Sequence, residues 1–508
     1  MKKIIFFFFI FIVLCAPGFA EPGIHISKDA GKITTLKDIS VELPDDTGVF
    51  RFYGRERFRW NLWDYAQSEP FDNEYDYFSS QLRFGSRFEN ALFKAHAAWQ
   101  YTQLWNLPTG VSAGAGAGAA YFSNGILQKE SHGTYLKYLE LSLKDIWKTG
   151  LVPSIGRFEY SSGYQYKGPT DTPEAKKLDW LKSKRISERV IGGFEWSEYQ
   201  RSFDGVKAAW DKDPVYLSVA AMSPTQGGFE EKAGTEIEDI RLIASELTLK
   251  KDKLVSGTEF QFFHYHYEDM RLLSATATRP DNTGRSVVSG FENDINLDMI
   301  GGHAAGAWSL GEGTLDALVW GGWQTGEWYE LDHNAYALAA EVGYQWNKLP
   351  WKPWVRGGYN MASGDHDASD NSHDTFYPML PTTRLYSASI LYNSMNLEDL
   401  FVTLSAKPCS VISVKTDAHF LSLDERSDRW YLGSGPMNSN KLTDYTARSS
   451  SGHDDLGVLW DVTLTWDIQA DVTASAYYGH LFGGDVVKTF YTDQKEVNFF
   501  SLEFAVNF

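Results

Sequence analysis

The sequence predicts an all-β protein, a transmembrane antiparallel up-and-down β-barrel of 18 strands. Aromatic residues make up 15% of the 508 residues, yet the mean hydropathy is −0.34. A bundle of membrane-spanning helices needs several runs of about 20 apolar residues, and the sequence has one apolar run, at its N-terminus. From about residue 48, apolar and polar side chains alternate in segments separated by turns. This pattern is typical of β-strands with one apolar face and one polar face.

The N-terminal run predicts a secretory signal peptide over residues 1–20. A short basic start precedes a dozen apolar residues and a small-residue exit that favours cleavage after Ala20. The alternative, a lipoprotein acylated at Cys15, is disfavoured because a leucine precedes that cysteine where a small residue is expected. Residues 21–47 carry no alternation and are predicted to be a periplasmic leader, which leaves residues 48–508 for the barrel.

The net charge disfavours nucleic acid as a partner, and the cysteine content excludes a disulfide within the exported chain. The formal net charge is −19, so an exported chain of this kind is not expected to bind nucleic acid through bulk charge. Of the 2 cysteines, Cys15 leaves with the signal peptide, and Cys409 then has no cysteine partner within the chain. Backbone pairing and packing must therefore hold the fold together.

The last segment illustrates the alternation: Phe500, Leu502, Phe504 and Val506 share one face, and polar or small side chains take the other. The same period of two predicts strands near 48–64, 76–89, 91–104, 133–144, 151–160, 203–211, 215–223, 240–250, 254–267, 296–310, 313–324, 334–346, 353–361, 398–406, 409–420, 456–467, 471–481 and 496–508.

Connection lengths distinguish a barrel from a soluble sandwich, which also alternates. Long connections such as 105–132 and 161–202 take turns with short ones such as 145–150, which is typical of an outer-membrane barrel. A strand-like piece, Arg384–Tyr392, lies inside the long connection 362–397. We interpret it as part of a loop that folds into the lumen, because a nineteenth strand would break the alternation of loop lengths.

Basic residues follow the polar face of the first two segments. That face must be the lumen, because an arginine turned to lipid near the bilayer midplane costs about 2–4 kcal/mol. Two interpretations stay open. The guanidinium groups could bind the carboxylates of a passing anion in bidentate fashion, or they could pair with lumenal acids such as Glu140 and Glu503 and fill the barrel. The candidate residues on these and similar strand positions are Arg55, Arg57, Arg59, Arg83, Arg87, Arg157, Lys207 and Arg356.

Enzyme and cofactor motifs are absent from the sequence, which has no GxSxG, HExxH or Walker A pattern. We therefore expect no enzymatic activity and no cofactor. The nearest candidate for a cation is the loop with Asp365, Asp367 and Asp370, whose closely spaced carboxylates suit Ca²⁺. The preferred interpretation of that loop is a solvated acidic segment.

Three stretches resemble the alginate export family of bacterial outer-membrane channels. They are RSFDGV at Arg201–Val206, YNMASGDHDASDNSHDTFYPMLPTTRLY at 359–386, and the pre-terminal hairpin from Gly452. The chain departs from the family where Met379-Leu380-Pro381-Thr382 stands in place of Leu-Phe-Pro-Thr. Phe508, on the apolar face of the last strand, is similar to the assembly signal of outer-membrane barrels.

The resemblance implies an 18-stranded barrel with an electropositive constriction that passes an acidic exopolysaccharide or similar anion. By this resemblance, the residues that form the constriction are Arg55, Arg57, Arg157, Arg201 and Arg356, with Asp204 as a neighbouring acid. We therefore expect a passive channel in the outer membrane for an anionic polysaccharide such as alginate.

Three other functions remain as alternatives. They are a general or small-organic-anion diffusion porin, a barrel lipid hydrolase and an adhesin that uses its long loops. Outer-membrane lipid, the anionic solute and periplasmic export proteins are the expected partners, and a monomer is the default state.

Overall fold

The computed structural model describes residues 40–43, 47–112, 114–124, 127–272, 279–285, 295–441 and 443–508. The predicted signal peptide, residues 1–20, and most of the predicted leader lie outside the described residues. Among the helices of the described ranges, none combines the length and the apolar character needed to cross a membrane.

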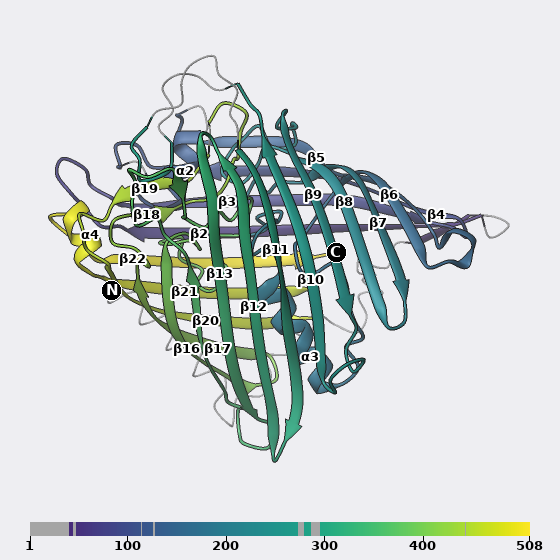
Figure 1. Cartoon of the computed structure of the whole chain (residues 1–508). Helices are drawn as coiled ribbons and strands as arrows, with labels where there is room; N and C mark the ends of the chain where they lie inside the picture. The colour runs from purple at the N-terminus through teal and green to yellow at the C-terminus, as the bar shows by residue number, and fades with distance from the viewer. Residues whose placement is uncertain are drawn as a thin grey trace.

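Eighteen antiparallel strands form one closed barrel (Figure 1). Each strand pairs with the next, and the first pairs with the last from Arg55↔Asn507 to Asp64↔Asn498, so this wall has no free edge. The strands are β2 Val49–Asp64, β3 Glu74–Glu89, β4 Phe93–Trp105, β5 Ser131–Leu143, β6 Leu151–Phe158, β7 Phe203–Lys212, β8 Val215–Pro224, β9 Ile240–Leu249, β10 Thr258–Asp269, β11 Ile295–Leu310, β12 Gly313–Trp328, β13 Leu331–Trp346, β14 Trp354–Ala362, β16 Leu397–Cys409, β17 Ile412–Ser422, β20 Asp455–Gln469, β21 Val472–Gly483 and β22 Val497–Asn507.

Every predicted strand is present, with ends that differ from the prediction by a few residues. The remaining elements lie at the barrel ends or inside it. They are the short strands β1 Ser40–Glu42, β15 Ser372–His373, β18 Arg429–Leu432 and β19 Thr446–Ser449, the helices α2 Gly116–Asn124, α3 Pro173–Leu181 and α4 Asp485–Phe490, and the single turns Ile146–Lys148 and Lys182–Ile186.

Long and short connections alternate between the two ends of the barrel, as predicted. The long loops 159–202, 363–396 and 423–454 share one end, and turns such as 213–214 and 410–411 lie at the other. One connection departs from the pattern, because two residues, Tyr329 and Glu330, join β12 to β13 at the long-loop end.

The alternation of side chains makes the outside of the barrel apolar. Phe58, Phe84, Leu338 and Phe420 are all about half exposed on the outward face, where a lipid chain would cover them. The residues between them point inward. A strand whose two faces meet such different surroundings has its register fixed by the sequence, since a slip of one residue would exchange the faces.

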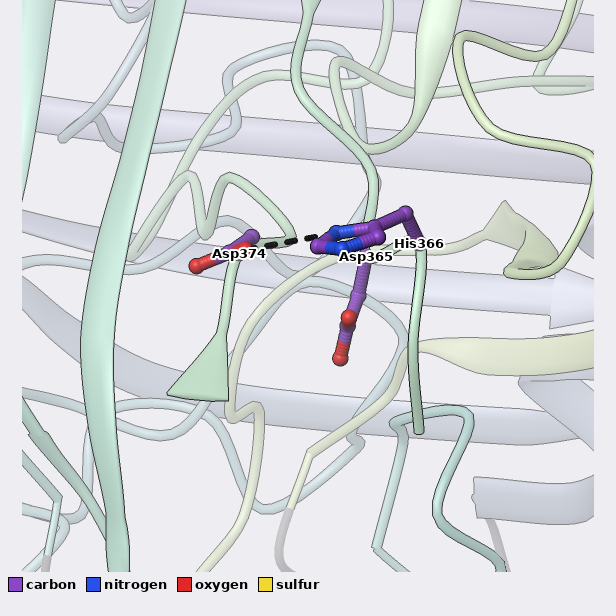
Figure 2. A group of neighbouring side chains, drawn as sticks. All are labelled: Asp365, His366 and Asp374. Atoms are coloured by element: carbon purple, nitrogen blue, oxygen red, sulfur yellow. Dashed lines mark ion pairs between the residues drawn. The ribbon is translucent and has the colours of Figure 1, made fainter. Parts of the chain in front are cut away.

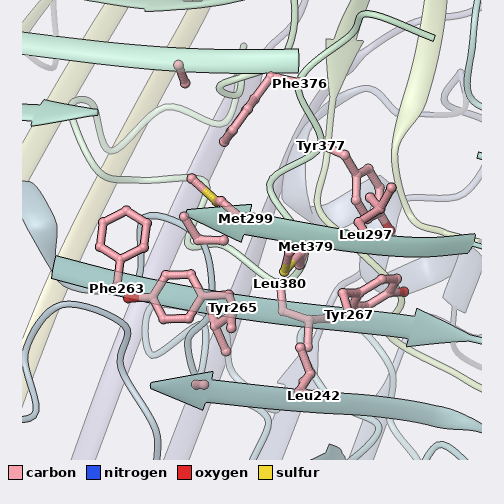
Figure 3. Close-up of a cluster of buried hydrophobic side chains, with 14 of the residues drawn as sticks. Leu242, Phe263, Tyr265, Tyr267, Leu297, Met299, Phe376, Tyr377, Met379 and Leu380 are labelled. Atoms are coloured by element: carbon pink, nitrogen blue, oxygen red, sulfur yellow. The ribbon is translucent and has the colours of Figure 1, made fainter. Parts of the chain in front are cut away.

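The core lies inside the barrel, because the long loops fold back into it. Phe376, Tyr377, Met379 and Leu380 of loop 363–396 pack against inward side chains of β9, β10 and β11 (Figure 3). Helix α3 of loop 159–202 also lies against the inner face, where Trp180 contacts Trp354 at 4.6 Å between ring centroids.

The strand-like piece Arg384–Tyr392 belongs to this lumenal filling and forms no strand, as interpreted from the sequence. Tyr386 donates a hydrogen bond to Glu341 of β13 at 3.0 Å, and Ser387 donates one to Asp461 of β20 at 2.8 Å. The piece therefore bridges two walls of the barrel.

Candidate functional site: the basic wall of the lumen

The inner faces of β2 and β3 carry the basic residues that the sequence singled out. In this pair of strands Arg55 lies directly opposite Arg83, and Arg51 lies directly opposite Arg87. Like charges directly opposite one another destabilise a β-ladder, whereas opposite charges stabilise it. The arrangement therefore concentrates positive charge on one wall near the short-turn end of the barrel.

Two further arginines of β2 are covered by loop 159–202. Arg57 donates to Glu198 at 2.7 Å and to the carbonyl of Ser197 at 3.1 Å. Arg59 donates to the same Glu198 at 3.0 Å and to Glu503 of β22 at 2.5 Å. Arg57 is 2% exposed and Arg59 is 5% exposed, so the loop seals both guanidinium groups from solvent.

Glu198 is the acid that makes this contact possible. Burial by itself would raise the pKa of Glu198, but the Arg57 and Arg59 guanidinium groups and the Ser79 hydroxyl hold that pKa below its ordinary value. The carboxylate therefore stays ionised at neutral pH and compensates both buried cations.

Three other candidate cations are paired with acids of neighbouring strands. Arg157 and Asp204 form a two-pronged pair at 2.7 and 2.5 Å, which agrees with the expectation that Asp204 is a neighbouring acid. Lys207 pairs with Glu140 at 2.9 Å. Arg356 is fully enclosed by Asp316 and by Glu341, the latter at 2.6 Å.

Arg201 lies apart from the strand wall, in the last turn of loop 159–202. It is 0% exposed, and its Nη2 donates to the carbonyl of Pro436 at 3.3 Å. Its carbonyl accepts a 2.5 Å hydrogen bond from Lys137 of β5. In this structure Arg201 joins loop 159–202 to loop 423–454 and does not line an accessible surface.

Of the candidate arginines on the barrel strands, three form no ion pair with a carboxylate within the described residues, whereas Arg57, Arg59, Arg157 and Arg356 do. Arg55 forms no ion pair there, and Arg83 donates to the neutral groups of Gln100, Gln200 and Tyr138. Arg87 is exposed and lies over the ring of Tyr53, with 4.8 Å between the guanidinium carbon and the ring centroid. Arg55 and Arg83 are half-buried and Arg87 is exposed, so these three side chains form the accessible part of the basic wall that has no ion pair.

Sequence reasoning named some of the acids that pair with the other candidate cations, namely Asp204, Glu140 and Glu503. It missed Glu198, Asp316 and Glu341. Asp316 and Glu341 lie on the polar faces of their strands, so the alternation of side chains could have identified them as lumenal acids. No pattern in the sequence connects Glu198, which lies in a long loop, to β2. Arg384 was also missed as a lumenal cation. Its guanidinium group lies over the ring of Trp196, and burial together with Arg59 lowers the pKa of Arg384 well below its ordinary value.

The acidic loop after β14 groups its residues differently from the prediction. Asp367 and Asp370 each accept hydrogen bonds from the serine two residues ahead. Asp365 instead lies with His366 and Asp374, and one ligand atom from each lies within 4.8 Å of the others.

Comparison with known proteins identifies relatives of this architecture. The family model for alginate export matches residues 181–499, which is more than half of the chain. Among curated proteins none matches. Each of three Pseudomonas aeruginosa structures matches over nearly its whole length. They are OpdK with vanillate (TM-score 0.52, 8% identity, 90% of this chain and 98% of that chain), OccK9 (OpdG; 0.57, 9%, 90% and 98%) and OccK2 (OpdF) in complex with glucuronate (0.52, 7%, 93% and 98%).

At such low identity these structures bear on the fold, and their shared form is that of an outer-membrane barrel. The family match covers loop 159–202 from residue 181, the loops 363–396 and 423–454, and the strands from β7 to the start of β22. The chain therefore belongs to the alginate export family and is a β-barrel channel of the outer membrane.

Proposed function

We propose that this channel conducts an anionic, carboxylate-bearing solute passively along an arginine-lined lumen, and that the solute is an acidic exopolysaccharide such as alginate. The observation that carries the proposal is the accessible wall of Arg55, Arg83 and Arg87, whose guanidinium groups have no carboxylate partner within the described residues. Two arginines directly opposite each other lower the stability of a β-ladder. A purely structural role would not require this concentration of positive charge.

The chemistry of passage follows from the guanidinium group. Its planar fork binds a carboxylate through two hydrogen bonds, and each bond replaces one that the solute made with water. Several such sites in series allow a polyanion to move from one to the next without deep binding at any of them. Arg55, Arg83 and Arg87 provide this series within two adjacent strands.

The position of the wall favours export. Arg51, Arg55, Arg83 and Arg87 lie toward the short-turn end, while loop 159–202 covers Arg57 and Arg59 toward the long-loop end. In bacterial outer-membrane barrels the short turns face the periplasm. A solute that arrives from the periplasm would therefore meet the accessible guanidinium groups first.

A small organic anion is the second candidate solute. Loop 159–202 reduces the exposure of Arg57 to 2% and of Arg59 to 5%, and a polymer strand would have to displace it. Two similar barrels have been solved with the carboxylates vanillate and glucuronate. Flux of monomeric glucuronate without block by an oligouronate would favour this candidate over the polysaccharide.

The test is single-channel conductance and ion selectivity of the refolded chain in planar bilayers, with an oligouronate as blocker. We expect anion selectivity in the wild type and a block that weakens by more than about tenfold in Arg55→Ala/Arg83→Ala, since each lost charge-assisted hydrogen bond is worth about 1.5–3 kcal/mol and about 1.4 kcal/mol corresponds to a factor of ten. Arg241→Ala is the matched control, because it removes an exposed arginine paired with Glu268 on another strand pair. Cation selectivity, or a double variant that behaves like the control, would overturn the proposal.

A further inference from the structure

A second site lies in loop 363–396, away from the basic wall. Asp365, His366 and Asp374 are brought together where the loop leaves β14, and the Nδ1 of His366 lies 3.8 Å from an Asp374 oxygen. Figure 2 shows the His366 ring facing Asp374, with the Asp365 side chain extending away from that pair. Ligand atoms within 4.8 Å of one another can surround one cation, because metal–ligand distances are about 2.0–2.6 Å.

The buried carboxylate of Asp365 gives an independent reason to expect a ligand. Asp365 is 0% exposed. Its Oδ1 accepts a 3.1 Å hydrogen bond from the Asp367 amide, while its Oδ2 has no hydrogen-bond partner among the described residues. A buried polar atom without a partner costs free energy, and a charged one costs more. A bound cation would remove that cost.

The negative charge around Asp365 also favours a bound cation. Among the described residues, Asp365 has no lysine or arginine within ion-pair distance, and neither do Asp374 and Asp428 nearby. Burial and the negative charges of Asp428 and Asp374 raise the pKa of Asp365 to about 6. Several carboxylates thus share one region without a neutralising side chain other than His366.

We propose that Asp365, His366 and Asp374 bind a divalent transition-metal ion of the Mn²⁺ or Zn²⁺ type. Ca²⁺ takes six to eight oxygen ligands, whereas an imidazole together with two carboxylates is a donor set that Mn²⁺ and Zn²⁺ accept. The ion would join the start of the loop to residue 374, directly before the buried stretch Phe376–Leu380. It would thereby fix the stretch that packs against β9–β11 inside the lumen.

The experiment measures binding of Zn²⁺, Mn²⁺ and Ca²⁺, each alone, to the refolded full chain in detergent after treatment with a chelator. Titration calorimetry should give a single Zn²⁺ or Mn²⁺ ion per chain, with affinity about tenfold or more lower in Asp374→Asn and in His366→Ala. Both side chains are more exposed than Asp365, so these variants should fold. Limited proteolysis should also show that the ion protects loop 363–396.

Asp367→Asn is the matched control, because it removes the same charge from an exposed neighbour outside the cluster. Its affinity for the ion should equal that of the wild type. The proposal is overturned if no ion binds, if Asp374→Asn binds as the wild type does, or if only Ca²⁺ binds and His366→Ala leaves that binding unchanged. None of these results depends on whether the channel carries anions.

Discussion

Glu198 joins the lumenal loop 159–202 to the barrel wall through two buried arginines. Removing one partner of a buried ion pair typically costs about 3–5 kcal/mol, because the other charge is left uncompensated. Here one carboxylate compensates both Arg57 and Arg59, with Glu503 as a second partner of Arg59. Attachment of the part of loop 159–202 that covers β2 therefore depends on the ionisation of this one side chain, while other contacts such as Lys182 with Glu259 hold the rest of the loop.

This dependence predicts a pH effect on the channel. The pKa of Glu198 is held below 4.5, so its contribution to loop attachment is fully present above that pH and is lost as the pH falls through the lowered value. We expect conductance fluctuations to rise on acidification from about pH 7 to about pH 3 as the loop detaches. Single-channel recording across this range measures the effect.

The variant Glu198→Gln isolates the contribution of this residue from those of other titrating acids. It should show the fluctuations already at neutral pH and a flatter pH profile. Asp171→Asn removes a charge from an exposed position of the same loop and should behave as the wild type. Identical pH profiles for the wild type and Glu198→Gln would contradict the prediction.

Among the strands, β5 contains an irregularity that periodicity alone does not show. Leu136 pairs with Trp99 and Tyr138 pairs with Ala98, so Lys137 is the extra residue of a β-bulge. Lys137 contacts Arg201 inside the barrel, and Tyr138 accepts a hydrogen bond from Arg83. The bulge thus turns two consecutive side chains toward the lumen.

The bulge predicts an unusual tolerance to deletion. Removing Lys137 would leave Leu136 and Tyr138 adjacent in regular register, each still on its own face. We expect this variant to form the barrel, because no other side chain changes face. Heat-modifiable mobility on an unboiled gel, together with circular dichroism, measures barrel formation.

Deletion of Ala340 in the regular strand β13 is the control. It would shift the register by one residue and turn a buried acid such as Glu341 toward lipid, so this variant should not assemble. Equal assembly of the two deletion variants would show that the bulge does not absorb the change.

At the scale of the whole molecule, closure of the barrel depends on the two ends of the described wall. The amide of Phe508 donates to the carbonyl of Gly54 at 2.9 Å, and the amide of Gly54 donates to the carbonyl of Phe508 at 2.5 Å. A β-carbon on Gly54 would lie 2.1 Å from the Phe508 ring, so a glycine is needed for this approach. The last residue therefore completes the seam between β2 and β22.

Deletion of Phe508 should lower the yield of assembled protein in the outer membrane. It removes two seam hydrogen bonds and the terminal aromatic residue that resembles an assembly signal. Phe508→Tyr keeps both features and should assemble as the wild type does. Quantitative blotting of outer-membrane fractions measures the difference, and a normal yield without Phe508 would contradict the role of the seam.

The sequence by itself determined the wall of this protein. Each strand has one face toward lipid and one toward the lumen, and a slip of one residue in register would exchange the two faces. The strands can therefore be identified from local alternation of apolar and polar residues, as in β22. The family resemblance implied Asp204 as a neighbouring acid, and the structure places Asp204 directly opposite Arg157 on the adjacent strand.

Only the tertiary structure decided what fills the lumen and which arginines stay accessible. The partner of Arg57 is 141 residues away in a loop without periodicity, and the Asp316 partner of Arg356 is 40 residues away. A loop that folds into the barrel meets the wall through individual contacts that no repeating pattern specifies. The strands position the arginines, whereas the path of the loops determines which of them can meet a solute.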